Sequence, residues 1–507
     1  MKVIRGSRKH HYMVRGSILL VTAVLVWAVM GCTDVYPTEY QLTISSTAGG
    51  SVVSPREEIS THMKGTQVTL IAVPDDGYRF VRWTGDVGTF GDVERAQIVI
   101  TIRRDYSITA EFEKMPEYHL TVSATVGGRV IKPKQVMSTY KGEQVVDLEA
   151  DEDVGWGFVN WTGNVSTVAT VNAAVTTIIV DGNYSIRANF EKEEAVNITD
   201  ADLEAAIKKA THIFDRPLYP SDLKRLTSLE AEAKNVSDLT ALEYCTGLTN
   251  LRLHDNQIDG ISPVANLTSL TYLYLSANQI DDISPLTNLT SLRHLDLSGN
   301  QIDDISPVAN LTSLTYLYLS ANQIDDISPL ANLTSLKKLY LSTNQIDDIS
   351  PLANLTSLKD LYLSGNQITD ISALASLTSL GQLYLSGNQI TDISALASLT
   401  SLRELYLSGN QITDISALAT HRSLTDLSLG GNQIDDISPL ANLSNLTLLN
   451  LSTNQISDIQ PLVDNAGLLQ GDKVYLYNNP LGYSPLSYSY ASTCIAQLEM
   501  RGVIVEW

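Results

Sequence analysis

The feature that most constrains the fold is a 22-residue unit that repeats through the C-terminal half of the chain. Each unit carries the pattern L-x-x-L-x-L-x-x-N-x-I, and one copy consists of Leu270, Leu273, Leu275, Asn278 and Ile280. A short and fixed period predicts a solenoid, which offers an extended binding surface rather than a closed catalytic pocket. The asparagine recurs at Asn256, Asn278, Asn300, Asn322, Asn344, Asn366, Asn388, Asn410, Asn432 and Asn454.

Each residue type in the unit has a predicted role. The leucines and isoleucines are expected to point inward and to stack on their copies, while Asn278 satisfies backbone groups at the bend. Ser284 is expected to cap a short helical turn on the convex side, with Pro285 at its first position. One aspartate per turn, from Asp282 through Asp458, fits either calcium binding or helix capping, and both interpretations stay open at this stage.

The repeats at 226–484 are flanked by segments 196–225 and 485–507, which we predict to be caps. A stack of parallel strands ends in two edge strands, whose unpaired backbone groups must be covered. Thr199 is the candidate N-cap of a first helix. The final segment predicts a helix over 488–500 and a closing strand over 503–505. The residues expected to face inward from that last helix are Tyr490, Cys494, Ile495 and Leu498.

The first 31 residues contain five Lys or Arg and no Asp or Glu, and they end in an apolar run at 17–31. This pattern predicts a signal peptide, because the run is too short to span a membrane comfortably. The Gly-Cys junction at Cys32 resembles the bacterial lipoprotein signal, which implies lipid attachment at Cys32 and a short tether over 32–39. An uncleaved anchor and a nearby cleavage without lipid are the alternatives, and both also place the body outside the cytoplasm.

Residues 40–113 and 118–191 form a second internal repeat with a period of 78 residues. Runs of β-branched residues, separated by Gly-Gly and Thr-Gly pairs, predict two small and mostly β domains. Trp83 aligns with Trp161, and each tryptophan fits either a buried core or a carbohydrate-binding site. Both copies resemble the divergent B-repeat modules of internalin-type proteins, which implies stalks or weakly adhesive units.

The region from 196 to 507 resembles the internalin-like class of bacterial leucine-rich repeat proteins. The resemblance rests on the segment Asn-Gln-Ile-Asp-Asp-Ile-Ser-Pro-Leu, on the helical first cap and on the terminal Arg-Gly-Val-Ile-Val. It implies an α/β leucine-rich repeat solenoid of horseshoe type, with parallel strands on the concave face and two small mostly β domains before it. Such a fold does not by itself identify a ligand.

Side chains that alternate with the inward leucines are expected to line the concave face, with the tyrosine rings in solvent. Two adjacent units, 375–396 and 397–418, differ only at the start of this strand. The variation indicates either a tuned recognition surface or exposed positions that are free to drift. The candidate ligand-binding residues are Tyr272, Tyr274, His294, Asp296, Tyr316, Tyr318, Lys338, Tyr340, Asp360, Tyr362, Gln382, Tyr384, Glu404 and Tyr406.

The net charge, the cysteine positions and the absence of catalytic motifs limit the possible partners and chemistry. The net charge of -22 argues against nucleic acid as a partner, because phosphates require Lys and Arg. Cys245 and Cys494 are separated by about ten turns at ~4.8 Å each, so we expect two unpaired, buried thiols. No phosphate loop, dinucleotide fingerprint, H-E-x-x-H or nucleophile elbow occurs, so neither an enzyme nor a cofactor is indicated.

These observations predict a secreted, lipid-anchored envelope protein whose solenoid binds a protein or glycan ligand at the cell surface. The alternative is a structural envelope or matrix component whose repeats bind no defined ligand. Saturable binding of a partner by the isolated solenoid would favour the binding protein over the structural component.

The predicted anchor can be tested directly at Cys32. We expect Cys32→Ala to alter processing and to abolish metabolic labelling with a radioactive fatty acid, because the thiol is the acylated group. Acyl chains hold a protein firmly when more than one is present. Undiminished labelling of the variant would contradict the assignment.

Overall fold

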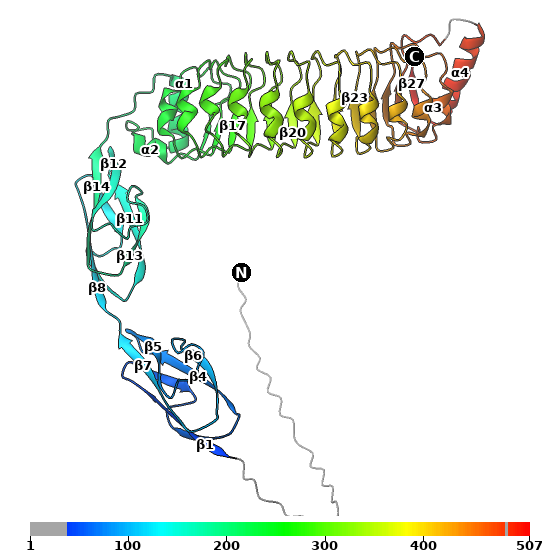
Figure 1. Cartoon of the computed structure of the whole chain (residues 1–507). Helices are drawn as coiled ribbons and strands as arrows, with labels where there is room; N and C mark the ends of the chain where they lie inside the picture. Colours follow the sequence, from blue (N-terminus) through cyan, green and yellow to red (C-terminus); the bar gives the residue numbers. More distant parts are fainter. Residues whose placement is uncertain (1–37, 482–484) are drawn as a thin grey trace, which may run out of the picture. The chain divides into compact units, whose positions relative to one another are not determined.

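The computed structural model describes residues 38–481 and 485–507 (Figure 1). The predicted signal peptide, Cys32 and most of the predicted tether lie outside these residues. In the part of the chain that is described, no helix combines the length and apolar character needed to cross a membrane.

The first β domain contains one sheet of four strands, in the order β3-β1-β7-β5, and one of three, in the order β2-β4-β6. Strands β1 and β7 run parallel, and the other pairs run antiparallel. Both sheets contribute side chains to one buried core. The strands are β1 (Glu39–Ser46), β2 (Gly50–Ser54), β3 (Ile59–Met63), β4 (Gln67–Pro74), β5 (Tyr78–Gly85), β6 (Gln97–Thr101) and β7 (Tyr106–Lys114).

The second β domain repeats this topology, with sheets in the orders β10-β8-β14-β12 and β13-β11-β9. The parallel pair is again formed by the first and last strands, β8 and β14. The strands are β8 (Glu117–Ala124), β9 (Gly128–Lys132), β10 (Met137–Lys141), β11 (Gln144–Glu152), β12 (Trp156–Gly163), β13 (Val175–Val180) and β14 (Tyr184–Lys192).

One tryptophan anchors the core of each β domain. Trp83 and Trp161 are each only 1% exposed. The indole N–H of Trp83 donates to the carbonyl of Arg95 at 2.9 Å, and that of Trp161 donates to the carbonyl of Ala173 at 3.0 Å. The core interpretation of these residues is therefore confirmed, and neither indole has a ring face available for a sugar.

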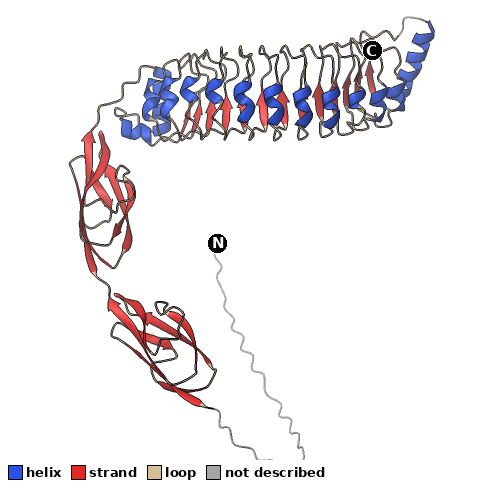
Figure 2. Ribbon diagram, in the orientation of Figure 1, coloured by secondary structure: helices blue, strands red, loops and turns tan. Residues whose placement is uncertain are grey.

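The solenoid is built on a parallel sheet of 13 strands in sequence order, with short helices along its other side (Figures 1 and 2). Equivalent residues of successive units pair directly, as Leu317 pairs with Leu339. The strands are β15 (Ser228–Glu230), β16 (Asn250–Arg252), β17 (Tyr272–Tyr274), β18 (His294–Asp296), β19 (Tyr316–Tyr318), β20 (Lys338–Tyr340), β21 (Asp360–Tyr362), β22 (Gln382–Tyr384), β23 (Glu404–Tyr406), β24 (Asp426–Ser428), β25 (Leu448–Asn450), β26 (Lys473–Tyr475) and β27 (Ile504–Glu506).

An inward asparagine ties each turn to the one before it. The Asn300 amide donates to the carbonyl of Leu297 in its own turn, at 2.9 Å, and to that of Leu275 in the preceding turn, at 3.0 Å. Its side-chain oxygen accepts the backbone N–H of Ile280 at 3.0 Å. The predicted asparagine ladder is confirmed, and it leaves the amide of Asn300 fully satisfied although the residue is buried.

The convex side is formed by short 3-10 helices, and all of those described except η1 begin at a serine. Ser284 does not cap its helix as expected: it is the first helical residue, and the N-cap position is Ile283, whose side chain makes no capping hydrogen bond. Asp282, one residue earlier, holds the start of the helix instead. The Asp282 carboxylate accepts the Ser284 N–H at 2.8 Å and its hydroxyl at 3.0 Å. The helices are η1 (Thr240–Tyr244), η2 (Ser262–Asn266), η3 (Ser284–Leu286), η4 (Ser306–Val308), η5 (Ser328–Asn332), η6 (Ser350–Asn354), η7 (Ser372–Ser376), η8 (Ser394–Ser398), η9 (Ser416–Leu418) and η10 (Ser438–Asn442).

Helices α1 (Ala201–Thr211) and α2 (Pro220–Lys224) precede the first solenoid strand. The N-cap of α1 is Asp200 rather than the expected Thr199. Asp200 is better placed because its second carboxylate oxygen also accepts the backbone N–H of Ser237, at 2.8 Å. One side chain thus caps the helix and fastens it to the first turn.

Helices α3 (Gln460–Asp464) and α4 (Pro485–Met500) lie near the other end, where β27 adds the last strand. Cys494 is buried as expected, and like Cys245 it is a free thiol. The expectation for Tyr490 is wrong: this residue is 44% exposed, and its hydroxyl lies 3.2 Å from the side-chain oxygen of Gln460. The phenol reaches water while its hydroxyl stays bonded.

One repeat departs from the pattern in its core. His421 occupies the position that leucine holds in the neighbouring units, and it is fully buried. Its Nε2–H donates to the carbonyl of Leu396 at 3.0 Å, whereas Nδ1 has no hydrogen-bond partner among the described residues. Burial lowers the pKa of His421 below its ordinary value of 6.5. The imidazole is therefore neutral in the fold and incompletely satisfied.

We predict that His421→Leu raises the melting temperature, because a buried unsatisfied group costs about 1–3 kcal/mol. The variant should also gain acid resistance. As the pH falls below about 6.5, the unfolded imidazole binds a proton that the folded one, with its lowered pKa, resists. Stability should therefore fall from about pH 7 to about pH 5 in the parent chain and fall less in the variant.

Thermal melts across this pH range provide the test. The control is His119→Gln, since His119 is exposed in the second β domain. Identical pH profiles for the parent chain and His421→Leu would contradict the prediction.

Candidate ligand-binding face

Each solenoid strand presents two side chains outward and one inward. In β20 the inward residue is Leu339, which is fully buried, while Lys338 and Tyr340 are partly exposed. Stacking the strands in register turns these outward positions into two columns. The tyrosine column consists of Tyr274, Asp296, Tyr318, Tyr340, Tyr362, Tyr384 and Tyr406. The mixed column consists of Tyr272, His294, Tyr316, Lys338, Asp360, Gln382 and Glu404.

All fourteen candidate residues therefore lie on one face of one sheet, on consecutive strands. The expectation that the rings stand in solvent is wrong in part, because most of them are largely covered and only partly exposed. Tyr272, at 45%, is the most exposed of the set. The reason is that the rings cover one another.

The aromatic rings of the tyrosine column stack face to face. The ring centroids of Tyr340 and Tyr362 are 4.0 Å apart, and their planes differ by 10°. The next two pairs, leading to Tyr384 and Tyr406, lie at 4.1 and 4.4 Å with angles of 11° and 9°. These separations are shorter than the ~4.8 Å between strands, so the outward side chains converge.

His294 fills the one break in the tyrosine column. At that position β18 carries Asp296, which has no ring. The imidazole of His294 crosses from the mixed column and lies 4.6 Å from the Tyr274 ring and 5.1 Å from the Tyr318 ring. We call the resulting series the ring stack; it comprises Tyr274, His294, Tyr318, Tyr340, Tyr362, Tyr384 and Tyr406.

The pKa of His294 is lowered from its ordinary value, mainly by burial. The charge of Asp296 opposes this shift, and the charge of Arg252 adds to it. A neutral imidazole is thus favoured between the two tyrosine rings, and it stacks there as an aromatic group rather than as a cation.

Arg252 closes the first end of the ring stack. It stands on β16, in register with Tyr274, and its guanidinium carbon lies 5.0 Å from the centre of the Tyr274 ring. A cation over a tyrosine face is a favourable contact. Arg252 was not among the candidate residues. Its place in the repeat, 22 residues before Tyr274, was the signal that could have identified it.

The mixed column holds the phenol hydroxyls in place. The Tyr362 hydroxyl donates to the side-chain oxygen of Gln382 at 2.9 Å, and that of Tyr384 donates to Glu404 at 2.5 Å. Lys338 pairs with Asp360 at 2.8 Å. The face is therefore a preorganised array of ring edges, hydroxyls and paired charges, with little freedom left to lose on binding.

Burial and hydrogen bonding raise the pKa of two phenols in the stack, Tyr340 and Tyr384. Burial, followed by the contact with the Tyr362 hydroxyl, raises the pKa of Tyr340 to about 12. Burial also raises the pKa of Tyr384, with the hydrogen bond to Glu404 as the next cause. Tyr340 and Tyr384 therefore present neutral hydroxyls as hydrogen-bonding groups at physiological pH.

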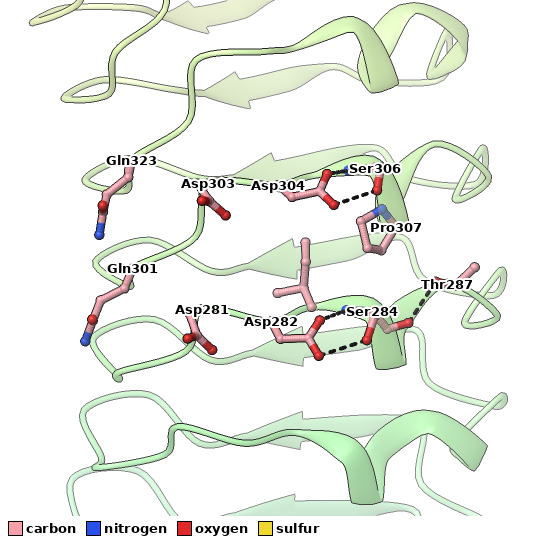
Figure 3. Close-up of a pocket in the computed structure, with 11 residues that line it drawn as sticks. Asp281, Asp282, Ser284, Thr287, Gln301, Asp303, Asp304, Ser306, Pro307 and Gln323 are labelled. Carbon is pink, nitrogen blue, oxygen red and sulfur yellow. Dashed lines mark hydrogen bonds between the residues drawn. The ribbon is translucent and has the colours of Figure 1, made fainter.

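A separate acidic groove runs along one rim of the solenoid, at the start of the convex side (Figure 3). Asp282 and Asp304 line it, and each carboxylate accepts the backbone N–H and the hydroxyl of a serine two residues later. These hydrogen bonds lower the pKa of Asp282. The aspartates thus hold the serine that starts each of these convex helices. No cluster of three metal-binding side chains occurs in the described chain.

Comparisons with known proteins bear on both halves of the chain. The family model for the divergent InlB B-repeat domain matches residues 40–116 and 118–194. An internalin, InlF, from Listeria monocytogenes shares 36% identity and a TM-score of 0.53, over 61% of this chain and 95% of that one. The chain belongs to the internalin-like leucine-rich repeat proteins. The model for paired leucine-rich repeats matches 246–288, 290–332, 334–376, 378–420 and 422–464.

A second internalin from the same species, InlC2, shares 40% identity over 42% of this internalin-like chain and 93% of its own length, with a TM-score of 0.39. No curated protein matches the chain. The resemblance inferred from the repeat and cap motifs is confirmed, as is the predicted combination of two β domains with a parallel-strand solenoid.

Proposed function

We propose that the concave face of this internalin-like solenoid binds a protein ligand without catalysing a reaction. The observation that carries the proposal is the ring stack, held in register beside a column of polar and charged groups. Tyrosine offers large contact area at a low cost in side-chain entropy, and it is enriched among the residues that dominate interface energies. The array is concave and preorganised, which reduces the ordering cost of binding.

The stacking geometry favours a protein over a glycan as the ligand. A sugar packs its C–H groups against an open aromatic face, where the π electrons are accessible. Both faces of Tyr362 are covered, by Tyr340 at 4.0 Å and by Tyr384 at 4.1 Å. The inner rings offer edges and hydroxyls instead, and these groups suit the mixed polar and apolar surface of a protein.

We further propose that lipid on Cys32 holds the chain at the outer face of a membrane. The two β domains would then act as spacers that present the solenoid. The basic and apolar start of the chain supports this arrangement, as does the acidic character of the whole chain, which favours a solvated surface. The first experiment is capture of partners from envelope and environmental extracts, with the full chain as bait.

We predict that Tyr340→Ala combined with Tyr362→Ala weakens binding of a captured partner by about tenfold or more, as expected for interface anchors. The control pair, Ser335→Ala with Ser357→Ala, lies in the same two turns on exposed loops and should leave affinity unchanged. Calorimetry or surface plasmon resonance would supply the affinities.

Stability is measured in parallel, because the stack also supports the fold. Each lost ring pair should cost about 0.5–1.5 kcal/mol, whereas the inward Leu341→Ala should cost about 2–5 kcal/mol. Tyr340→Phe with Tyr362→Phe keeps the rings and removes only the hydroxyls. A tyrosine pair that unfolds the protein but spares affinity would contradict the proposal and favour a scaffold role. No saturable partner at all would favour the structural alternative.

A further inference from the structure

The two ends of the ring stack are closed differently. At the first end, Arg252 on β16 lies in register with Tyr274 and covers its outer ring face, with 5.0 Å between the guanidinium carbon and the ring centre. At the other end, Tyr406 is stacked on one side only, by Tyr384 at 4.4 Å. The residue in register with Tyr406 on the next strand, β24, is Ser428. No described aromatic ring lies against the second face of Tyr406.

The side chains beyond Tyr406 contact other groups. The Ser428 hydroxyl lies 2.7 Å from that of Ser408, which stands two residues past Tyr406 on the neighbouring turn. One strand farther, the Asn450 amide leans over Gly430, to within 3.1 Å of where a Cβ would stand. Neither residue supplies a ring or a cation to the stack, and no described Lys or Arg lies over the Tyr406 ring as Arg252 lies over that of Tyr274.

Acidic groups border this open position. Asp426 is the mixed-column residue of β24, and Glu404 is its partner in register on β23. Asp426 accepts the hydroxyl of Thr425 at 2.7 Å through one carboxylate oxygen. Glu404 already accepts hydrogen bonds from Gln382 and Tyr384, so Asp426 is the better placed of the two to receive a new donor. In the neighbouring strands, Arg403 precedes β23 and Lys473 stands on β26, and neither forms an ion pair with Asp426 among the described contacts.

We propose that the open face of Tyr406, together with Asp426, binds an arginine side chain of the protein partner. The guanidinium would stack on Tyr406 as Arg252 stacks on Tyr274, and it would donate hydrogen bonds to the Asp426 carboxylate. A planar cation suits both contacts, because arginine stacks on aromatic faces and bonds carboxylates with a fixed fork of donors. The inference rests on the proposed function for the nature of the partner, but the site itself can be tested without one.

The probe is N-acetyl-arginine amide, with N-acetyl-citrulline amide as its neutral counterpart of the same shape. The full chain is labelled with 3-fluorotyrosine, and the fluorine signal of Tyr406 is assigned by its absence in Tyr406→Phe. We expect the arginine probe to shift this signal saturably and to bind about tenfold or more tightly than the citrulline probe, because only the guanidinium carries the charge.

Three variants separate this site from general attraction to an acidic chain. Asp426→Asn should weaken arginine binding by about threefold or more, as expected for the loss of a charge-assisted hydrogen bond. Asp435→Asn removes the same charge at an exposed position of the adjoining rim and should have no effect. Ser428→Arg places an arginine in register with Tyr406, as Arg252 stands to Tyr274, and it should abolish binding of the probe while the melting temperature holds.

Equal affinity for the two probes, or arginine binding that survives Ser428→Arg, would overturn this inference. Either result would leave the effect of Tyr340→Ala with Tyr362→Ala on partner capture untouched. Conversely, failure of that tyrosine pair to affect capture would overturn the proposed function without altering the Tyr406 signal, so the two failures are distinguishable.

Discussion

Hydrogen bonds from one buried asparagine per turn are the interaction on which the solenoid depends. Each amide bonds carbonyls in its own turn and in the preceding turn, and its oxygen accepts an N–H from the preceding turn. A buried backbone group without a partner is costly, so a slip of one residue would orphan several groups at once. The ladder therefore fixes the register of successive turns, and this register fixes which side chains become neighbours across strands.

The concave face is a consequence of this register. Because Tyr340 and Tyr362 must stand on adjacent strands, their rings meet at 4.0 Å and stack rather than projecting separately. Stacking covers the ring faces and leaves only the ring edges and hydroxyls for a ligand. These groups favour a protein ligand over a glycan. Only the ends of the stack differ: Arg252 covers one, and Tyr406 has an open face at the other. The two ends of the face therefore differ chemically, although its repeat units are nearly identical in sequence.

The sequence predicts the elements whose position follows from the repeat alone. Leu339 faces inward and Tyr340 outward because alternation is a property of any strand. Contacts that depend on side-chain rotamers or on more distant turns are not predicted. The crossing of His294 into the gap at Asp296 depends on its rotamer, and the choice of Asp200 over Thr199 as N-cap depends on Ser237, which lies 37 residues away. Tyr490 fits an inward helical pattern, but the bulk and hydroxyl of its ring favour the surface.

The most direct test of the binding face is hydroxyl-radical footprinting of the full chain, alone and with a captured partner, with oxidation of each residue read by mass spectrometry. The account predicts that the partner reduces oxidation of Tyr272, Tyr316, Tyr340, Tyr362 and Tyr406, while exposed aromatic residues away from the concave face, such as Phe214, stay unchanged. Unchanged oxidation of these tyrosines, with protection confined to the convex helices or the β domains, would contradict it.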